Sequence, residues 1–404
     1  MKYDFDKIIE RNNSDAIAVH GLGKCPCFAP DPPEEGFDVI PMWIADMNFE
    51  TCPTIQAELM ERVKHPLYGY FLALDEYYNS IISWHKARNH TEDLKREHIG
   101  EENGVLGGVV SAVNVFSQKG DNLLIHSPTY IGFTNCLENN GYKLIHSPLK
   151  LDENNVWRMD YEDMEKKIKE KKIHTAIFCS PHNPTGRVWE KEELIKVFEL
   201  FEKYEVNVVS DEIWSDLLLF GNKHITIQSV SPYAKKHTVA FYAPSKTFNT
   251  AGIVGSYHII FDKVLKEKVE KESSLCHYNN LNIFSMYTVI GAYKKEGHEW
   301  TDQLIEVLSA NAKYAVDYIK NHFKGVNAPC SQGTYVLFVD CTEWCKEHNK
   351  TIEELLKSCW RVGVAIQDGR IFNGPCHFRM NFALPMSKLK EAFDRLDKYV
   401  FNAK

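Results

Sequence analysis

The segment "HTVAFYAPSKTFNTAG" (237–252) joins an apolar run to a single cationic side chain. The run from His237 to Tyr242 is typical of a buried strand, and Lys246 follows shortly after its end. Lys246 is therefore either a surface residue beside a strand end or an amine that takes part in a reaction. The pattern of the rest of the chain separates these two interpretations.

Apolar runs of the same kind recur through the middle of the chain, with amphipathic stretches between them. The other runs are "DNLLIHSPTY" (121–130), "HTAIFCSPHNPTG" (174–186), "VNVVSDEIW" (206–214) and "GSYHIIF" (255–261). Between two of them, residues 189–204 carry apolar side chains at helical spacing, namely Leu194, Val197, Phe198, Phe201 and Tyr204. Strands that alternate with helices predict parallel crossovers and a doubly wound α/β sheet.

Past residue 290 the pattern changes. A long helix is expected over about 297–322, followed by "GTYVLFVD", another helix and "FRMNFALP". This order indicates a smaller α+β domain. We expect the N-terminal segment to pack with it, because the large sheet begins only later in the chain. The predicted division is a large domain over 48–290 and a small domain formed by 1–47 and 291–404.

Composition restricts the class of protein. The formal net charge of −8 and the pI of about 6.1 argue against a nucleic-acid partner, which needs a basic face. The 11 cysteines show no zinc-ligand spacing, so we expect reduced thiols and no metal. The first residues lack the apolar core of a signal peptide, and no stretch approaches the ~20 apolar residues of a membrane span. The sequence therefore predicts a cytoplasmic protein.

Unusual polar side chains follow four of the apolar runs. They are Tyr130, Asn183, Asp211 and Lys246. Open α/β sheets bind ligands at the carboxyl ends of their strands. Because all four residues occupy this position, the sequence predicts that they share one site.

A lysine amine, a buried carboxylate and a helix N-terminus together suit pyridoxal 5′-phosphate (PLP). The lysine forms a Schiff base with the aldehyde, and an acidic side chain pairs with the pyridine nitrogen so that the ring accepts electrons. The phosphate suits backbone N–H groups at the start of a helix. The glycine-rich stretch "ENGVLGGVVSAV" (102–113) offers such a start.

Each of these features also has an ordinary interpretation. Lys246 alone is most often a surface lysine, and Asp211 with Glu212 could cap a helix. Residues 183–186, "NPTG", form a good turn by themselves. Arg379 in "HFRMNF" could pair with any surface acid. The order and spacing of the whole set favour the functional interpretation.

The sequence resembles the fold-type I PLP enzymes of the class I/II aminotransferase clan. It is most similar to the cystathionine β-lyase-like C–S lyases of the cystalysin and MalY/PatB type. The segments that carry the resemblance are "IPMWIADMNF" (40–49), "YGYFLALDEYYNSI" (68–81), "SPTYIGF" (127–133), "FCSPHNPTGRVW" (178–189), "SDEIWSDL" (210–217), "APSKTFNTAG" (243–252) and "FRMNFALP" (378–385). The resemblance implies a seven-stranded, mostly parallel large sheet and a homodimer.

The resemblance also assigns roles around the cofactor ring. Lys246 is expected to hold the aldehyde and then to move the substrate proton. Asp211 is expected to pair with the pyridine nitrogen, Asn183 to donate to the 3′-oxygen and Tyr130 to stack on the ring. Trp214 stands beside the ring where many relatives have Tyr or His, and its indole offers one N–H donor.

Phosphate and substrate contacts follow from the same resemblance. The backbone N–H groups of Val105 and Leu106 and the Ser245 hydroxyl are expected to bind the phosphate. Tyr70 is expected to reach the phosphate from a neighbouring subunit. Arg379 is expected to bind the substrate α-carboxylate through its planar guanidinium, which suits two parallel hydrogen bonds. Asn183 and Tyr70 are also expected to contact the substrate.

Other positions depart from the pattern of relatives. Ile131 stands where cystalysin-like sequences have a second tyrosine, which removes a hydroxyl. Ala243 and Val254 stand where the wider clan often has a hydroxyl residue and an arginine. We therefore expect phosphate binding to depend more on backbone N–H groups and on Tyr70.

The resemblance implies a PLP-dependent carbon–sulfur β-lyase. Its substrates would be cystathionine, cysteine or other S-substituted cysteines, and its products a thiol, pyruvate and ammonia. Aminotransfer is the alternative, because it needs the same lysine, aspartate and arginine. A PLP-binding regulatory protein is a minor alternative.

Overall fold

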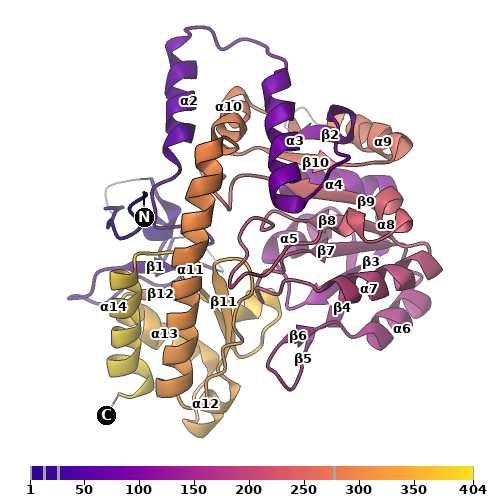
Figure 1. Cartoon of the computed structure of the whole chain (residues 1–404). Helices are drawn as coiled ribbons and strands as arrows, with labels where there is room; N and C mark the ends of the chain where they lie inside the picture. The colour runs from indigo at the N-terminus through magenta and orange to yellow at the C-terminus, as the bar shows by residue number, and fades with distance from the viewer. Residues whose placement is uncertain (1, 12–14, 25–27, 276–278, 404) are drawn as a thin grey trace.

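The computed structural model describes residues 2–11, 15–24, 28–275 and 279–403, and Figure 1 shows them as two lobes. Within these residues, seven strands form the sheet of the larger lobe. Their order is β2 (Ile99–Glu102), β10 (Ser256–Ile259), β9 (Thr238–Tyr242), β8 (Asn207–Asp211), β7 (Thr175–Cys179), β3 (Asn122–Ser127) and β4 (Lys143–Pro148). β10 runs antiparallel to both neighbours, and the pairs from β9 to β4 are parallel. The predicted fold class, with its large, mostly parallel sheet, is confirmed.

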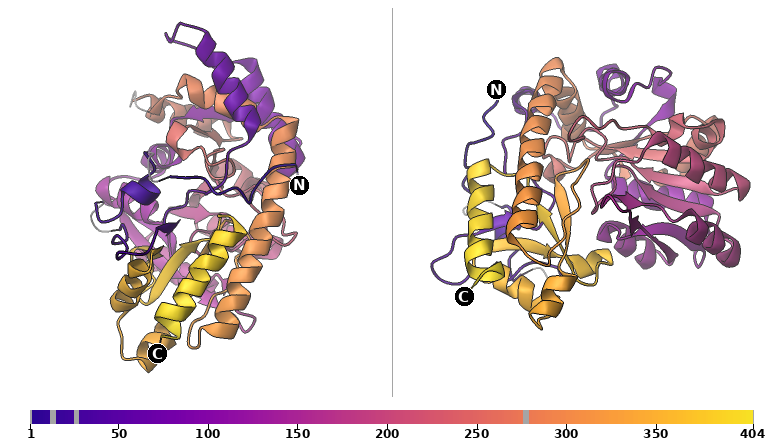
Figure 2. Two further views of the ribbon diagram at one scale, coloured as in Figure 1. Left: turned by 90° about the vertical axis from the view of Figure 1, so that its left-hand side faces the viewer. Right: turned by 60° about the horizontal axis from the view of Figure 1, so that its bottom comes forward.

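Both faces of this large sheet are covered by helices, as the two views of Figure 2 show. In β7, Ala176 and Phe178 pack on one face, while Ile177 and Cys179 pack on the other. The first face carries α6 (Tyr161–Lys171), α7 (Lys191–Lys203) and α8 (Pro232–His237). The second carries α4 (Val105–Phe116), α5 (Ile131–Asn139) and α9 (Lys263–Ser274). Strands buried on both faces explain the continuous apolar runs of the sequence.

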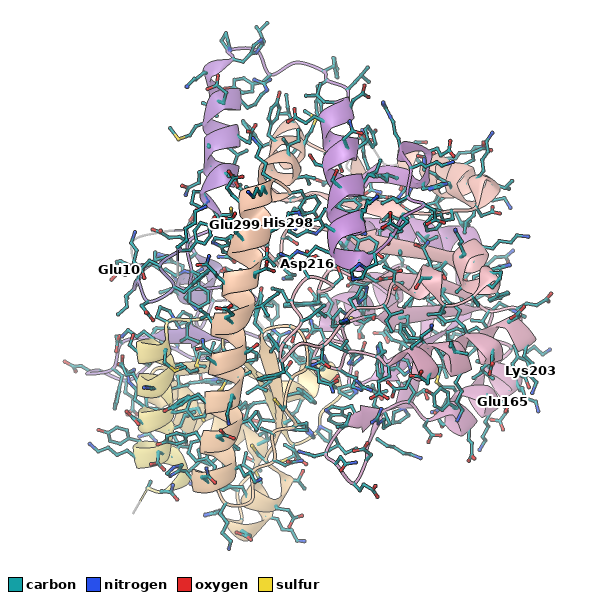
Figure 3. The ribbon with its side chains drawn as sticks, in the orientation of Figure 1. Glu10, Glu165, Lys203, Asp216, His298 and Glu299 are labelled. Carbon is teal, nitrogen blue, oxygen red and sulfur yellow. The ribbon has the colours of Figure 1, made fainter. Side chains whose placement is uncertain are left out.

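Helix α7 shows how the local sequence produces this layer. Glu190 precedes the helix, and its side chain and that of Glu193 form a capping box at the first turn. The apolar side chains predicted at helical spacing face the sheet, where each fully buried one contributes roughly 1.5–3 kcal/mol. On the outer surface Lys203 pairs with Glu165 of α6 at 2.8 Å (Figure 3). Exposed pairs of this kind contribute about 0–1 kcal/mol, so burial dominates.

The smaller lobe has its own sheet, formed within the described residues by four strands. The order is β1 (Ile40–Met42), β12 (Val364–Asp368), β13 (His377–Asn381) and β11 (Val336–Asp340). β1 pairs in parallel with β12, with Ile40 opposite Val364, so the N-terminal segment joins the C-terminal part. The helices of this lobe are α11 (Lys295–His322), α12 (Thr342–Glu347), α13 (Ile352–Arg361) and α14 (Met386–Leu396). The domain boundaries near residues 47 and 290 stay a prediction.

Two helices and their connection project from the larger lobe at the top of Figure 1. They are α2 (Pro53–Lys64) and α3 (Asp75–Asn89), and α2 packs against α10 (Ile283–Ala292). The connecting residues 65–74 contain no helix or strand. None of the helices in the described part of the chain is long and apolar enough to cross a bilayer.

Candidate active site

A cavity of about 860 Å³ lies where the carboxyl ends of four adjacent strands, β9, β8, β7 and β3, meet the smaller lobe. Tyr130, Asn183, Asp211 and Lys246, which follow or end these strands, all line it. The structure thus brings the four strand-end residues to one cavity. Arg379 of β13 lines the same cavity from the opposite lobe.

Lys246 lies in the loop that follows β9, and neighbouring contacts fix this loop. The Thr247 hydroxyl donates to the carboxylate of Asp216 at 2.9 Å, and Asp216, labelled in Figure 3, is itself buried. The Lys246 Nζ donates to the carbonyl oxygen of Ala45 at 3.1 Å and lies 5.6 Å from the ring centre of Trp214. Burial and, to a smaller extent, the charge of Arg379 together lower the pKa of Lys246 to about 8. At pH 7 about a tenth of this amine is therefore neutral.

Asp211 is the last residue of β8, and its side chain enters the cavity from the floor of the sheet. Its carboxylate accepts the backbone N–H of Ile213 at 3.0 Å. Burial raises the pKa of Asp211 to about 7, while this hydrogen bond and the charge of Lys246 act in the opposite direction. Among the ion pairs of the described residues, none joins Asp211 to Lys246 within 4.0 Å. The two groups interact electrostatically without forming an ion pair, and both line the same cavity.

Arg379 is buried, and its guanidinium is only partly satisfied by the protein. Its two terminal nitrogens donate to Asn183 Oδ1 at 3.3 Å and to the carbonyl oxygen of Trp43 at 2.9 Å. The guanidinium also stacks on Phe372, 4.4 Å from the ring centre. Its Nε–H has no acceptor among the described residues. Burial lowers the pKa of Arg379 to about 10, which still leaves it charged at neutral pH. A buried cation with an unused donor suits an anionic ligand.

The N-terminus of α4 opens into the same cavity. Gly104 precedes the helix, and within the described chain no side chain caps it. Val105 and Leu106 line the cavity, and the first N–H groups of a helix have no acceptor within that helix. Such a start binds anions, phosphate in particular. The Ser245 hydroxyl lines the cavity beside it.

These residues fit PLP in their chemistry. A lysine amine suits the aldehyde, a carboxylate suits the pyridine nitrogen and a helix N-terminus suits the phosphate. At Gly252, which also lines the cavity, nothing lies within 4 Å of the place where a Cβ would stand. The backbone is therefore open to a ligand at this side. Among the described residues no group of three or more His, Cys, Asp or Glu side chains could hold a metal ion.

One predicted site residue lies elsewhere. Tyr70 is fully exposed in the connection between α2 and α3 and does not line the cavity of its own chain. It lines a separate hollow of about 740 Å³ with Tyr68, Tyr78 and Arg96. The other departures noted in the sequence do reach the cavity, because Trp214, Ile131, Ala243 and Val254 all line it.

Sequence reasoning missed several residues that shape the cavity. Tyr335, which precedes β11, donates its hydroxyl to the carbonyl oxygen of Ala45 at 3.0 Å. Arg11 lines the cavity mouth and pairs with Asp46 at 2.6 Å. Their positions depend on the packing of the N-terminal segment against the smaller lobe, for which no local sequence pattern gives a signal.

The fold and the site together define the fold-type I class of PLP enzymes. The features that define it are an α/β sheet with helices on both faces, a small α+β lobe, and a lysine and an aspartate near the strand ends. Within this class, the chain belongs to the family "Aminotransferase class I and II", whose model matches residues 38–396.

Individual relatives give the type within the family. The cystathionine β-lyase PatB of Bacillus subtilis is 31% identical over 361 residues, which cover 89% of this chain and 92% of the relative. A PLP-bound crystal structure from Clostridium difficile 630, provisionally assigned as an aminotransferase, is 33% identical with a TM-score of 0.89 and covers 98% of this chain and 99% of that one. Cystalysin from Treponema denticola, which contains PLP, is 29% identical with a TM-score of 0.89 and covers 99% of each chain. The predicted similarity to PLP-dependent C–S lyases is confirmed.

Proposed function

We propose that this protein is a PLP-dependent carbon–sulfur β-lyase that acts on cystathionine and other S-substituted cysteines and releases a thiol, pyruvate and ammonia. The observation that carries the proposal is the geometry of Lys246 and Asp211. The amine and the carboxylate face one cavity without forming an ion pair, and the pKa of each is shifted towards neutrality. Relatives of the lyase type support this choice of reaction.

The residues have distinct tasks. PLP, when bound, supplies an aldehyde for the amino group of the substrate and a ring that accepts the electrons of the Cα–H bond. Val105, Leu106 and Ser245 hold its phosphate, and Asp211 keeps the pyridine nitrogen protonated. Tyr130 and Trp214 enclose the ring, and Asn183 donates to its 3′-oxygen.

Arg379 and Lys246 act on the substrate. Arg379 binds the α-carboxylate, which orients the Cα–H bond towards the loop after β9. Lys246 accepts the Cα proton as a general base, because its lowered pKa leaves it partly neutral. The carbon–sulfur bond then breaks and the thiolate gains a proton from the Lys246 ammonium. Hydrolysis of the remaining fragment yields pyruvate and ammonia.

Aminotransfer is the second candidate function. The family match and the Clostridium difficile structure favour it, and it uses the same residues. The two reactions differ in what they require. A lyase releases pyruvate and ammonia from cystathionine with no added 2-oxo acid, whereas an aminotransferase turns over only with a 2-oxo acid acceptor. Pyruvate release without an acceptor supports the lyase, and turnover that depends on the acceptor overturns it.

The Lys246→Ala variant distinguishes both reactions from a PLP-binding regulator. It removes the Schiff base and its absorbance. An enzyme loses its turnover with this change, whereas a regulator that acts without catalysis keeps its biological activity. Loss of pyruvate release together with the absorbance supports the catalytic proposal.

We also propose a homodimer in which Tyr70 binds the cofactor phosphate of the partner subunit. Helix α2 and the following connection carry several exposed apolar side chains, namely Met60, Val63, Leu67, Tyr68, Tyr70 and Leu72. Exposed apolar side chains that gather on a surface mark interaction sites, and Figure 1 shows that α2 and the connection project from the rest of the chain. A second copy of the chain covers these side chains in this proposal.

The cytoplasm is the proposed location of the protein. The described cysteines are free thiols, which suits a reducing compartment. The acidic net charge offers no support for a nucleic-acid partner.

A further inference from the structure

A fully buried carboxylate lies at the base of the proposed phosphate site. Glu102 ends β2, two residues before Gly104 and the start of α4, and it has no solvent exposure. Three side chains donate to it: His258 Nδ1 at 2.9 Å, the Ser273 hydroxyl at 3.1 Å and the Asn279 Nδ2. We call Glu102, His258, Ser273 and Asn279 the Glu102 cluster. Burying a carboxylate costs free energy unless hydrogen bonds compensate for the lost water. The three donors supply this compensation, and we ask what the buried carboxylate contributes to the structure around it.

Asn279 of the cluster contacts both the segment before α4 and the first turn of α4. On one side, the backbone N–H of Asn103 donates to the carbonyl oxygen of Asn279 at 3.0 Å. On the other, the Asn279 Oδ1 lies 2.9 Å from the place where a Cβ would stand on Gly107, so the amide lies against that turn. The Glu102–His258 pair ties this arrangement to the sheet, because Glu102 lies in β2 and His258 in the neighbouring β10. The cluster therefore links the start of α4 to two strands of the large sheet.

In the proposed function, the first N–H groups of α4 contribute a large share of the binding of the phosphate. Ala243 and Val254, at two positions where the wider clan often has a hydroxyl residue and an arginine, offer neither a hydroxyl nor a charge. Ser245, whose hydroxyl is the proposed side-chain contact of the phosphate, also lines the cavity. Backbone donors stabilise an anion only when they are held in the right direction before it binds. A phosphate site with few side-chain donors therefore depends more on preorganised backbone N–H groups than a phosphate site that contains an arginine.

We infer that Glu102 and Asn279 are positioning residues for the cofactor phosphate, acting through the first turn of α4 and not by contact with PLP. The inference rests on the proposed function, since it takes PLP as the ligand. The inference predicts that changes in the Glu102 cluster weaken binding of the phosphate and leave binding of the ring unaffected. Asp211, Asn183 and Lys246, the proposed ring contacts, lie at or after the ends of other strands, so we expect them to stay in place when the cluster is disturbed.

Comparison of PLP with pyridoxal, which lacks the phosphate, tests this inference. The apoproteins of the wild type, Asn279→Ala and Glu102→Gln are titrated with each compound, and binding is followed by Schiff-base absorbance. We expect the Kd for PLP to rise by about tenfold to a hundredfold, as for the loss of one charge-assisted hydrogen bond, and the Kd for pyridoxal to change less than about twofold. Equal weakening of both compounds, or an unchanged Kd for PLP, would overturn the inference.

Two controls complete the experiment. Gln228→Ala removes two buried hydrogen bonds, to the carbonyl oxygens of Thr238 and Ile259, at the opposite end of β9 from the cavity. It is expected to lower stability without changing either Kd, which shows what a merely structural loss does. If Glu102→Gln does not fold, Ser273→Ala takes its place, with a smaller shift in the same direction. A wild-type protein that binds neither compound would overturn the proposed function itself, whereas PLP binding without discrimination by the variants would overturn this inference alone.

Discussion

Lys246 and Tyr335 donate to the same acceptor, the carbonyl oxygen of Ala45, at 3.1 Å and 3.0 Å. The three residues come from the loop after β9, the start of β11 and the segment after β1. The Tyr335 ring also meets Trp214 edge to face, with ring centres 4.7 Å apart. The position of the reactive amine is thus set jointly by the large sheet, the small lobe and the N-terminal segment.

The variant Tyr335→Phe tests this relationship, because it keeps the ring and removes only the hydroxyl. The lost hydrogen bond to the shared carbonyl is worth about 1 kcal/mol. If this free energy is lost from the positioning of Lys246 in the transition state, kcat falls by about fivefold. Pyruvate release measured at saturating PLP gives kcat, and a PLP titration gives the Kd, which should stay within about twofold of the wild type. A variant that is less stable but keeps the wild-type kcat would show that Tyr335 only supports the fold.

The pH dependence of apoprotein stability reports the two shifted groups. Asp211 has its pKa raised from 3.8 to about 7, so the folded state holds a proton that the unfolded chain releases in this range. Stability therefore falls as pH rises from about 4 to about 7. Lys246 has its pKa lowered from 10.5 to about 8, so between these values the unfolded chain holds more protons and stability rises with pH. Across its own pH range, each group changes the free energy of unfolding by on the order of 3 kcal/mol. The two opposite slopes place the minimum of stability between pH 7 and 8.

Urea denaturation of the apoprotein at a series of pH values measures this profile. Asp211→Asn should remove the fall on the acid side, and Lys246→Met should remove the rise on the alkaline side. If both variants keep the slopes of the wild type, the two groups titrate normally in the folded chain and the profile has another origin.

The sequence predicted the parts of the fold that depend on local pattern. The five apolar runs became β3, β7, β8, β9 and β10, and the helical spacing over 189–204 became α7. The edge strands β2 and β4 were not singled out, because β2 (IGEE) has a single apolar side chain and β4 is partly exposed, so neither forms a continuous apolar run. The residues at the strand ends could be found because parallel topology gathers such positions. Tyr335, Arg11 and the Glu102 cluster could not, since their contacts join segments far apart in the chain.

Arg379→Lys should weaken substrate binding without loss of the cofactor. Lysine keeps the charge but cannot present two parallel donors, and its shorter polar group leaves the Asn183 and Trp43 contacts unmade. We expect kcat/KM for cystathionine to fall by about ten- to a hundredfold, as for the loss of a charge-assisted hydrogen bond, mostly through KM. Steady-state kinetics and the PLP spectrum measure the two effects. Unchanged kcat/KM would remove Arg379 as the carboxylate-binding residue.

Val254→Gly should stabilise the protein. Val254 has a φ of 59° and a ψ of 165°, a conformation that a β-branched residue adopts only at a cost of about 1–3 kcal/mol. Glycine adopts it freely but loses about 0.5–1 kcal/mol more entropy on folding, so the expected net gain is about 1 kcal/mol. The midpoint of urea unfolding should therefore rise.

The matched control is Val264→Gly, at an exposed valine in the first turn of α9. Here glycine relieves no strain and is expected to cost up to about 1 kcal/mol. If the two variants shift the midpoint in the same direction, the backbone at Val254 is not strained.

Mixing two inactive variants tests whether Tyr70 acts across a subunit interface. Tyr70→Ala lacks the proposed phosphate contact and Lys246→Ala lacks the amine, so neither homodimer should turn over cystathionine at a PLP concentration that only just saturates the wild type. After the two are unfolded together and refolded in equal amounts, about half of the dimers are mixed. Each mixed dimer contains one site with Lys246 from one subunit and Tyr70 from the other. Activity should therefore return to about a quarter of the wild-type value.

No recovery in a mixture shown to contain mixed dimers would mean that Tyr70 serves the site of its own subunit, or no site at all. The exposed position of Tyr70, outside the cavity of its own chain, favours recovery. A second mixture, of Asp211→Ala with Lys246→Ala, serves as the control. Both of these residues line the cavity of one chain, so a mixed dimer contains no intact site and should stay inactive. Recovery in the first mixture but not in this one would place Tyr70, alone of the three, in the partner's site.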